Sequence, residues 1–451
     1  MTDSLTVIAD DMVAGSLTRL RSGQLRFSYD EQYAARPAAT PLSLSMPLSQ
    51  LAHPDSVITP WLWGLLPDDP SVLMRWERHF HLSRAVPFTL LGTPIGLDCP
   101  GAVRFTQPDR TGQVIHGAGQ VAWLTEDDVA QVLRELGRDS TSWLGEDFSG
   151  QFSLAGAQAK TALLYQDGRW GVPSGPTPTT HILKPAIAGL AGHDLNEHLC
   201  LDAARRCGLP AVRSRIAKFG DQSAIVVDRY DRYPFGAGFG RIHQEDLCQA
   251  LAVPPTRKYQ NEGGPGPNDI AELLRRAMPT RVAEQAVRGF ADALIWNWLI
   301  AGTDAHAKNY SLLLSRGEAR LAPLSDIASA LPYGDHEKKL RLAMKIGGDY
   351  QLNPHRNRWP DAARDLGLPA GELVARAREL AAAAADAFAD AAKAPDVLAQ
   401  DSALPARLTD LVAERSGRCT RLLGGTGPDG CGLRAQWRTL SGGRCRAGRW
   451  P

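Results

Sequence analysis

Short apolar runs separated by turn residues occupy the first part of the chain and predict β-strands. Residues 17–20 and 25–29 lie on either side of a Ser22-Gly23 turn, which is the pattern of a β-hairpin. Residues 61–69, WLWGLLPDD, are aromatic enough to belong to a core. Further strands are predicted at residues 161–165, 181–183 and 224–229.

Helical periodicity prevails after about residue 240. In residues 281–301 apolar side chains recur every four positions from Val282 to Trp298, which predicts one long helix. Residues 370–393 are rich in alanine, the residue with the highest helix propensity. Shorter helices are predicted at residues 71–79, 126–139 and 195–207. Strands followed by helices indicate an α+β chain, in which a small sheet lobe leads into a helical lobe.

Composition narrows the class of protein. The length of 451 residues exceeds one ordinary core and predicts two or three domains. Hydrophobic residues make up 43% and charged residues 22% of the chain, as in ordinary globular proteins. The formal net charge of +1 argues against a global electrostatic attraction to nucleic acid. The seven cysteines contain no C-x-x-C pair, so neither a disulfide framework nor a zinc site is expected.

The two ends of the chain differ in character. The first residues lack a basic region followed by an apolar stretch, so we expect no secretory signal. We also expect no membrane association, because no apolar run approaches the roughly 20 residues that span a bilayer. A cytoplasmic location follows as the default expectation. Residues 416–451 are rich in Gly and Arg and show no apolar period, which predicts a mobile, solvated tail.

The candidate chemistry lies in residues 296–331. The predicted long helix leads into a polar loop, residues 303–309. Two short predicted strands, 310–314 and 320–323, then return the chain to Asp326. A kinase needs this order of parts, because phosphoryl transfer requires a carboxylate that orients the attacking hydroxyl and oxygen ligands that hold magnesium against the phosphates.

Two residues of the polar loop have the spacing of a kinase catalytic loop. Asp304 and Asn309 stand five positions apart, as the catalytic Asp and Asn of that loop do. Asp326 is placed as a second magnesium carboxylate, and oxygen ligands suit magnesium better than zinc. The alternative is that Asp304 and Asn309 only form a turn after a helix. His306 either reaches a phosphate or makes a structural hydrogen bond, and the role of Lys308 stays open.

A kinase also needs a cation for the phosphates from the other lobe. Lys184 ends a short predicted strand, and Glu197 on the next helix is placed to pair with it, although lysines on strands are common. Residues 152–161 are small and flexible before a strand, so that backbone N–H groups could approach phosphates. This segment matches neither a Walker A loop nor the Gly-x-Gly-x-x-Gly loop of protein kinases.

Together these segments resemble the HipA family of serine/threonine kinases, the toxins of bacterial toxin–antitoxin pairs. The resemblance spans roughly residues 5–395 in the right order. The strings that carry it are SLAGAQAKTALL (153–164), THILKP (180–185), NEHLCLDAARRCGLP (196–210), VVDRYDR (226–232), RIHQEDLCQALAVPPTRKYQNEGGPG (241–266), TDAHAKN (303–309) and LSDIASALPY (324–333), with WLWGLLPDD (61–69) and DCPGAVRF (98–105) similar to the family's N-terminal domain.

The resemblance implies a role for individual residues. Asp304 corresponds to the catalytic base and His306 to the catalytic-loop histidine, while Asn309 and Asp326 correspond to the magnesium ligands. ATP would be bound by Lys184 at its phosphates, by Asp228 and Tyr230 near its adenine, and by the phosphate loop Ala155, Gly156, Ala157 and Gln158. Ser153 corresponds to the serine whose autophosphorylation inactivates the family's kinases. Gln244, Glu245 and Asp246 match a family signature with a mainly structural role.

The resemblance also implies an architecture. We expect a bilobal protein-kinase-like core, with a small sheet lobe at residues 146–240 and an all-α C-terminal lobe at residues 241–400. An N-terminal α/β domain would occupy residues 1–145, and a mobile tail residues 401–451. The Gly/Arg-rich residues after about 415 depart from the family's pattern, which leaves the C-terminal boundary open.

Partners follow from the resemblance in the same way. Family members are neutralised by a small helix-turn-helix antitoxin that binds operator DNA. Their known targets are aminoacyl-tRNA synthetases, glutamyl-tRNA synthetase among them. Two alternatives remain: a small-molecule kinase, whose loop usually begins with His where Gly302-Thr303 stand here, and a non-catalytic corepressor that binds an antitoxin on DNA. The presence of Lys184, Asp304, Asn309 and Asp326 together argues against the corepressor.

Overall fold

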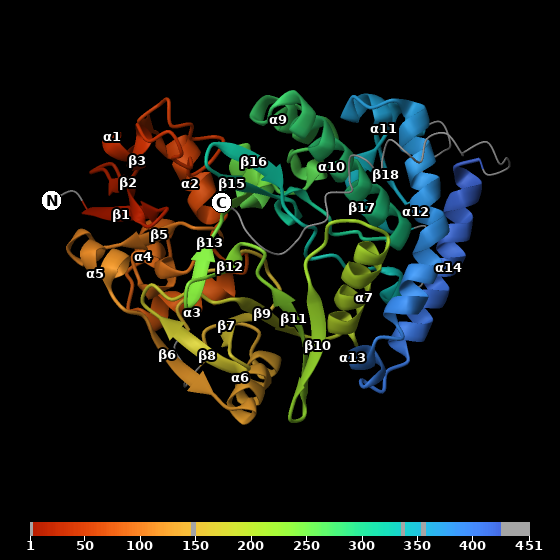
Figure 1. The fold of residues 1–451 in the computed structure, drawn as a ribbon, viewed down its shortest axis with the longest axis horizontal. Coiled ribbons are helices and arrows are strands. Elements are labelled where there is room, and N and C mark those ends of the chain that lie inside the picture. The colour runs from red at the N-terminus through yellow and green to blue at the C-terminus, as the bar shows by residue number, and fades with distance from the viewer. Residues whose placement is uncertain (1–2, 146–149, 335–338, 353–357, 425–451) are drawn as a thin grey trace.

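The computed structural model describes residues 3–145, 150–334, 339–352 and 358–424. Figure 1 shows the N-terminal elements on one side of the molecule and the long helices α12 and α14 on the other. The central strands β7, β9 and β11 lie between them. The fold is α+β, as the sequence predicts.

The N-terminal domain is built on a five-stranded sheet of order β4-β3-β2-β1-β5. The predicted hairpin is confirmed, because β2 pairs antiparallel with β3 and Leu17 lies opposite Phe27. Both side chains are fully buried, as is Trp61 on α2. The elements are β1 (Asp3–Ala9), β2 (Met12–Arg19), β3 (Leu25–Tyr29), α1 (Glu31–Ala34), β4 (Ala52–His53), α2 (Asp55–Trp63), α3 (Pro70–His79), α4 (Pro87–Leu91), β5 (Arg104–Thr106) and α5 (Thr111–His116).

The sheet lobe contains six strands in the order β10-β11-β9-β7-β8-β6. Its first strand, β6, pairs antiparallel with β8, so the lobe begins near residue 120 and the predicted boundary at residue 146 is too late. The sequence did not predict β6, because its burial does not alternate: the Trp123 side chain is partly exposed, with the guanidinium of Arg169 4.4 Å from the ring centre. The elements are β6 (Gln120–Leu124), α6 (Glu126–Arg138), β7 (Thr161–Gln166), β8 (Arg169–Ser174), β9 (His181–Pro185), α7 (His193–Arg206), β10 (Ser214–Phe219) and β11 (Gln222–Asp228).

The C-terminal lobe is mainly helical, but the expectation of an all-helical lobe is wrong. It also carries a sheet of order β14-β15-β16 and the hairpin β17–β18, and the hairpin β12–β13 precedes it. The strands are β12 (Arg232–Phe235), β13 (Gly238–Arg241), β14 (His243–Asp246), β15 (Ser311–Ser315), β16 (Glu318–Leu321), β17 (Arg341–Ile346) and β18 (Asp349–Gln351). The helices are α8 (Leu247–Ala250), α9 (Pro267–Ala277), α10 (Thr280–Ile300), α11 (Arg358–Leu366), α12 (Ala370–Ala391), α13 (Pro395–Leu398) and α14 (Leu404–Leu422).

The predicted start of the tail at residue 401 is also wrong. Helix α14 packs against α12, and its side chains Leu408, Val412 and Arg415 are fully buried. Arg415 donates to the carbonyl oxygens of Trp298 and Leu352. The Gly/Arg-rich residues 425–451 lie outside the described residues.

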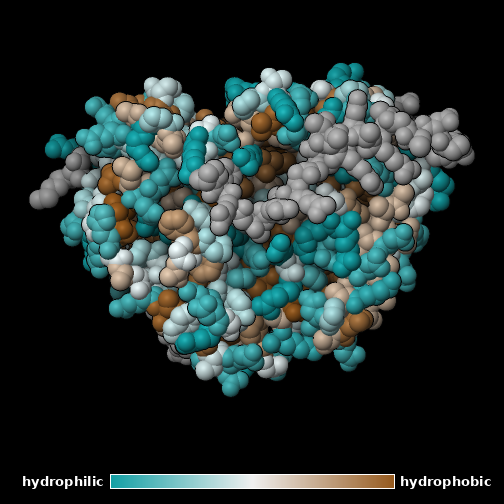
Figure 2. All heavy atoms as spheres, viewed as in Figure 1, coloured by the Kyte–Doolittle hydropathy of each residue, from teal (hydrophilic) through white to brown (hydrophobic). Residues whose placement is uncertain are grey.

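Two apolar cores hold the molecule together. One fills the helical lobe around α10, and the other joins the N-terminal domain to the sheet lobe, where Trp61 shares a cluster with Leu183 and Val226. The N-terminal domain is therefore packed onto the sheet lobe through apolar side chains. Polar residues cover most of the face in Figure 2, with hydrophobic ones in small separate groups. No helix in the described part of the chain is long and apolar enough to cross a membrane.

Candidate active site

Two adjoining cavities lie between the sheet lobe and the helical lobe. The larger has a volume of about 650 Å³ and is lined by Asp304, His306 and the phosphate loop. The smaller, of about 150 Å³, is lined by Lys184, Asp228 and Tyr230. The residues that line both are Ala155, Glu197, Lys308, Asn309 and Asp326. The predicted site residues other than Ser153 therefore line one continuous region.

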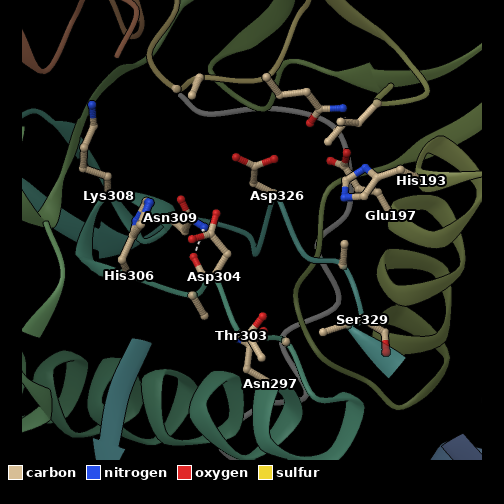
Figure 3. A pocket seen from close by; sticks show the side chains of 18 of the residues that line it. His193, Glu197, Asn297, Thr303, Asp304, His306, Lys308, Asn309, Asp326 and Ser329 are labelled. Atoms are coloured by element: carbon tan, nitrogen blue, oxygen red, sulfur yellow. Dashed lines mark hydrogen bonds between the residues drawn. The ribbon is translucent and has the colours of Figure 1, made fainter. Parts of the chain in front are cut away.

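The candidate catalytic loop, residues 303–309, begins where α10 ends. Ala301 adopts a left-handed backbone conformation with φ 54°, which turns the chain out of the helix. Gly302 is required next, because a Cβ atom there would lie 2.2 Å from the Oδ1 atom of Asn297. The loop is then closed on itself, since Nδ2 of Asn309 donates to the carbonyl oxygen of Asp304 at 2.7 Å (Figure 3). That bond uses the amide nitrogen of Asn309 and leaves its amide oxygen available to a cation.

A tyrosine orients the carboxylate of Asp304. The hydroxyl of Tyr259 donates to Oδ1 of Asp304 at 2.5 Å, and the Tyr259 ring packs edge-on against His306 with centroids 4.8 Å apart. Burial, together with this hydrogen bond, raises the pKa of Tyr259, which keeps it a donor. Burial lowers the pKa of His306 to about 4, so its ring is neutral at neutral pH.

Lys184 joins the two lobes electrostatically. It lies on β9, and its Nζ atom is 2.8 Å from Oε1 of Glu197 on α7 and 2.6 Å from Oδ1 of Asp326. Burial would lower the pKa of Lys184, but the two carboxylates outweigh it and raise the pKa. Lys184 in turn holds the pKa of Asp326 far below its usual range. The predicted pairing of Lys184 with Glu197 is confirmed.

Asp326 occupies a strained backbone position. Its φ of 57° lies in the left-handed region, which residues other than Gly rarely adopt. Such strain persists where surrounding contacts fix it and is frequent at functional sites. Figure 3 shows Asp304, Asn309 and Asp326 around the same open space, with Glu197 and His193 on its other side.

The candidate phosphate loop contains a lysine that the sequence does not mark as a site residue. Nζ of Lys160 donates to the carbonyl oxygen of Ala155 at 2.6 Å and lies 4.9 Å from the ring centre of Trp143. Gly156 has φ +100°, and a Cβ atom there would lie 2.7 Å from the same Nζ. Burial lowers the pKa of Lys160 to about 8. The sequence feature that could have identified Lys160 is its position at the end of a segment of small residues.

Ser153 does not face either cavity. Its side chain is fully buried, and its hydroxyl donates to the carbonyl oxygen of Leu65 at 2.6 Å. Its backbone N–H donates to the carbonyl oxygen of Asp98 at 3.0 Å. These two bonds hold the segment around Ser153 against the N-terminal domain.

Asp228 and Tyr230 flank the inter-lobe connection. Asp228 ends β11 and is exposed, with Oδ1 3.3 Å from Nε2 of His181. Tyr230 is partly buried and lines the smaller cavity beside Asp228. Backbone groups of this segment are paired, since the N–H of Arg229 donates to the carbonyl oxygen of Thr180. The structure places both residues in the smaller cavity, which Lys308 and Asn309 also line.

The signature Gln244-Glu245-Asp246 serves mainly structural contacts. Asp246 caps α8 by accepting from the backbone N–H of Gln249 at 2.9 Å. Glu245 accepts from the backbone N–H of Leu44 at 2.8 Å, which ties β14 to the N-terminal domain. Gln244 and Asp246 also line the smaller cavity.

Asp68 of the N-terminal domain is a site residue that the sequence did not indicate. Its Oδ1 atom lies 2.5 Å from Nζ of Lys308 and its Oδ2 atom 2.8 Å from Nζ of Lys258. Burial would raise the pKa of Asp68, but the two lysines lower it. The three residues come from distant segments, so no local pattern could reveal them.

The donor atoms suit a hard cation that is shared with phosphates. Within the described residues, no group of three or more His, Cys, Asp or Glu could hold a metal ion by itself. The carboxylate of Asp326 and the amide oxygen of Asn309 are oxygen ligands, and magnesium completes its shell with phosphate oxygens and waters. The side chains present therefore fit a magnesium–nucleotide site.

Comparisons with known proteins now bear on this geometry. Residues 152–388 match the protein family described as the HipA-like C-terminal domain, and residues 5–106 match the one described as the HipA N-terminal domain. The chain belongs to the HipA family. The resemblance seen in the sequence is thereby confirmed.

Relatives of known name support the same assignment. A Sinorhizobium fredii protein named "Putative kinase Y4mE" is 34% identical over 91% of this chain and 97% of its own length. The serine/threonine-protein kinase toxin HipA of Shewanella oneidensis is 29% identical, over 85% of this chain and 88% of its own length. The chain is therefore an enzyme of the kinase class.

A solved structure supports the fold. The complex of Shewanella oneidensis HipA with HipB and its operator DNA matches 94% of this chain and 100% of its own, with a TM-score of 0.78 and 23% identity. At this level of identity the match shows a common fold. It includes the N-terminal domain as well as both lobes of the HipA core.

Proposed function

We propose that this HipA-family protein transfers the γ-phosphate of ATP, with magnesium, to a serine or threonine of another protein. The observation that carries the proposal is the convergence of Lys184, Asp304, Asn309 and Asp326 on one cleft between the lobes. These are the groups that phosphoryl transfer requires. The adjoining smaller cavity, at the inter-lobe connection, fits the adenine end of the nucleotide.

The site residues divide the work between the acceptor and the nucleotide. Oδ1 of Asp304 is occupied by the Tyr259 hydroxyl, so Oδ2 is the oxygen that would accept the acceptor's hydroxyl proton and orient that hydroxyl. The ammonium group of Lys184 would leave Asp326 and contact the phosphates, while its ion pair with Glu197 would remain. Lys160 adds a second cation at the phosphate loop. Magnesium held by Asn309 and Asp326 would neutralise the negative charge of the phosphates.

Asp326→Asn tests the magnesium ligand. The variant removes the anionic ligand but keeps a side chain of the same shape, so phosphoryl transfer should require several-fold more magnesium. Rates would be measured across a magnesium titration at saturating ATP. A magnesium dependence equal to that of the wild type would remove Asp326 from the metal site.

Self-inactivation through Ser153 is part of the proposal. A phosphate would add about −1.5 to −2 charges inside a loop that binds ATP phosphates. It would also break the bond from Ser153 to Leu65 and so release the loop. After incubation with ATP and magnesium, mass spectrometry should find phosphate on Ser153. Ser153→Ala should then stay active for longer, and an equal loss of activity in both proteins would refute the switch.

The partners proposed are those of a toxin. We propose a helix-turn-helix antitoxin that neutralises the kinase and carries it to operator DNA, because the matched Shewanella structure is a complex with HipB and operator DNA. The proposed acceptor is a translation enzyme, an aminoacyl-tRNA synthetase such as glutamyl-tRNA synthetase. Labelled ATP and a panel of purified synthetases would identify it, and absence of label on every synthetase would exclude this substrate class.

A further inference from the structure

A short segment of the N-terminal domain contacts two loops of the cleft. Residues 65–68 follow α2 and reach the phosphate loop through backbone groups, since the carbonyl oxygen of Leu65 accepts from Ser153 and the N–H of Asp68 donates to Gly156 at 3.0 Å. The side chain of Asp68 points the other way, to the catalytic loop, where it binds Lys308. One segment therefore connects loops that lie about 150 residues apart in the sequence.

The side chain of Asp68 contacts residues that adjoin the candidate catalytic groups in the sequence. Lys308 lies between Asp304 and Asn309 in the sequence, and its side chain is only 3% exposed. Lys258, the second partner of Asp68, precedes Tyr259, whose hydroxyl binds Asp304. Asp68 thus holds Lys258, which adjoins Tyr259, and Lys308, which adjoins Asn309.

Removal of the Asp68 charge would leave two cations beside the catalytic loop. The two ammonium groups lie within 2.8 Å of the same carboxylate, so without it they would repel each other. Asp304 lines the same cavity, and once released from Asp68 the two lysine side chains would be free to turn toward its carboxyl group. Such competition would turn the catalytic carboxylate away from an acceptor hydroxyl.

We propose that Asp68 is a positioning residue of the kinase: it holds the catalytic loop, through Lys308 and Lys258, in register with the phosphate loop. The inference rests on the proposed kinase activity. It makes the N-terminal domain a working part of the active site, because Asp68 belongs to that domain.

Asp68→Asn tests the proposal, with Asp69→Asn as the matched control. Asp69 caps α3 by accepting from Ser71, and Asn can cap a helix equally well. For phosphoryl transfer to a protein acceptor, Asp68→Asn should lower kcat about 10- to 100-fold, because small displacements of catalytic groups are costly. The KM for ATP should change little, since the backbone bond to Gly156 remains. Asp68→Glu should restore part of kcat.

A double-mutant cycle shows whether Asp68 affects kcat through Lys308 or through a general loss of structure. Lys308→Met should lower kcat, and adding it to Asp68→Asn should cost less than the product of the two separate effects. Multiplicative effects would contradict coupling. Equal kcat values for Asp68→Asn and Asp69→Asn would overturn the proposal for Asp68. If the wild type still transferred phosphate in that case, the proposed kinase function would stand.

Hydrogen exchange gives a readout that does not need activity. In Asp68→Asn the peptide covering residues 303–309 should exchange faster than in Asp69→Asn, and a peptide from β2 should be unchanged in both. Equal exchange at residues 303–309 would refute the positioning role. Absence of transfer by the wild type would refute the proposed function, whatever the exchange shows.

Discussion

Lys184 shows how a single side chain can serve both stability and chemistry. Its ammonium group lies between Glu197 and Asp326, and the side chain of Glu197 is only 2% exposed. A buried carboxylate that loses its partner costs far more than the intact pair contributes, because the remaining charge stays away from water. The lysine is therefore needed to keep Glu197 buried even when no nucleotide is bound.

Lys184→Met should lower the free energy of unfolding by about 3 kcal/mol. Adding Glu197→Gln should recover part of the loss, because the second change removes the unpaired charge. Urea unfolding of the two variants would measure this, with Lys393→Met as control, since that lysine is 73% exposed. No recovery in the double variant would contradict this account of the pair.

The sequence allowed candidate site residues to be named, but it did not reveal the contacts that hold them in place. Asp304, Asn309, Asp326 and Lys184 could be named because phosphoryl transfer limits which residues can occupy such spacings. The residues that contact these side chains come from distant segments, and the chemistry does not restrict which residues they are. Asp68 meets Lys258 and Lys308 only after three segments have packed together.

The elements of the chain were predictable where their period was strong. The long helix α10 and the hairpin β2–β3 lie where the apolar pattern placed them. The predicted start of the tail at residue 401 precedes helix α14, whose buried positions are interspersed with charged residues. Its apolar face, which includes Leu408 and Val412, appears only against α12.

Leu408→Ala tests the assignment of α14 to the core. The fully buried side chain should leave a cavity, and the free energy of unfolding should fall by about 2–5 kcal/mol. Asp410→Ala on the same helix is exposed and should change stability by less than about 0.5 kcal/mol. If the two variants unfolded at the same urea concentration, α14 would not contribute to the core.

The whole molecule depends on contacts between the N-terminal domain and the two lobes. One of these is Glu245, whose carboxylate accepts from Ser43 and from the backbone of Leu44. Burial raises the pKa of Glu245 from its usual 4.5 to about 8. The folded chain then holds a proton that the unfolded chain has lost, so stability is greatest below about pH 4.5 for this group and declines as the pH rises to about 8.

The pH dependence of thermal unfolding would show this contribution. The wild type should unfold at a lower temperature at pH 8 than at pH 6. Glu245→Gln should reduce the corresponding difference in the free energy of unfolding by roughly 1 kcal/mol or more, because glutamine stays neutral. Glu318→Gln, an exposed acid on β16, is the control. An unchanged difference in Glu245→Gln would contradict the raised pKa.

The measurement that tests the central claim most directly is the rate of phosphate transfer from γ-labelled ATP, with magnesium, to a protein acceptor by the wild type and Asp304→Asn. The account predicts label transfer by the wild type and a rate at least about 100-fold lower in the variant, because the base is lost while the bond to Tyr259 can remain. Asp167→Asn, at an exposed turn, should match the wild type. Near-normal transfer by Asp304→Asn would contradict the assignment of the catalytic base, and no transfer by the wild type would contradict the proposed kinase.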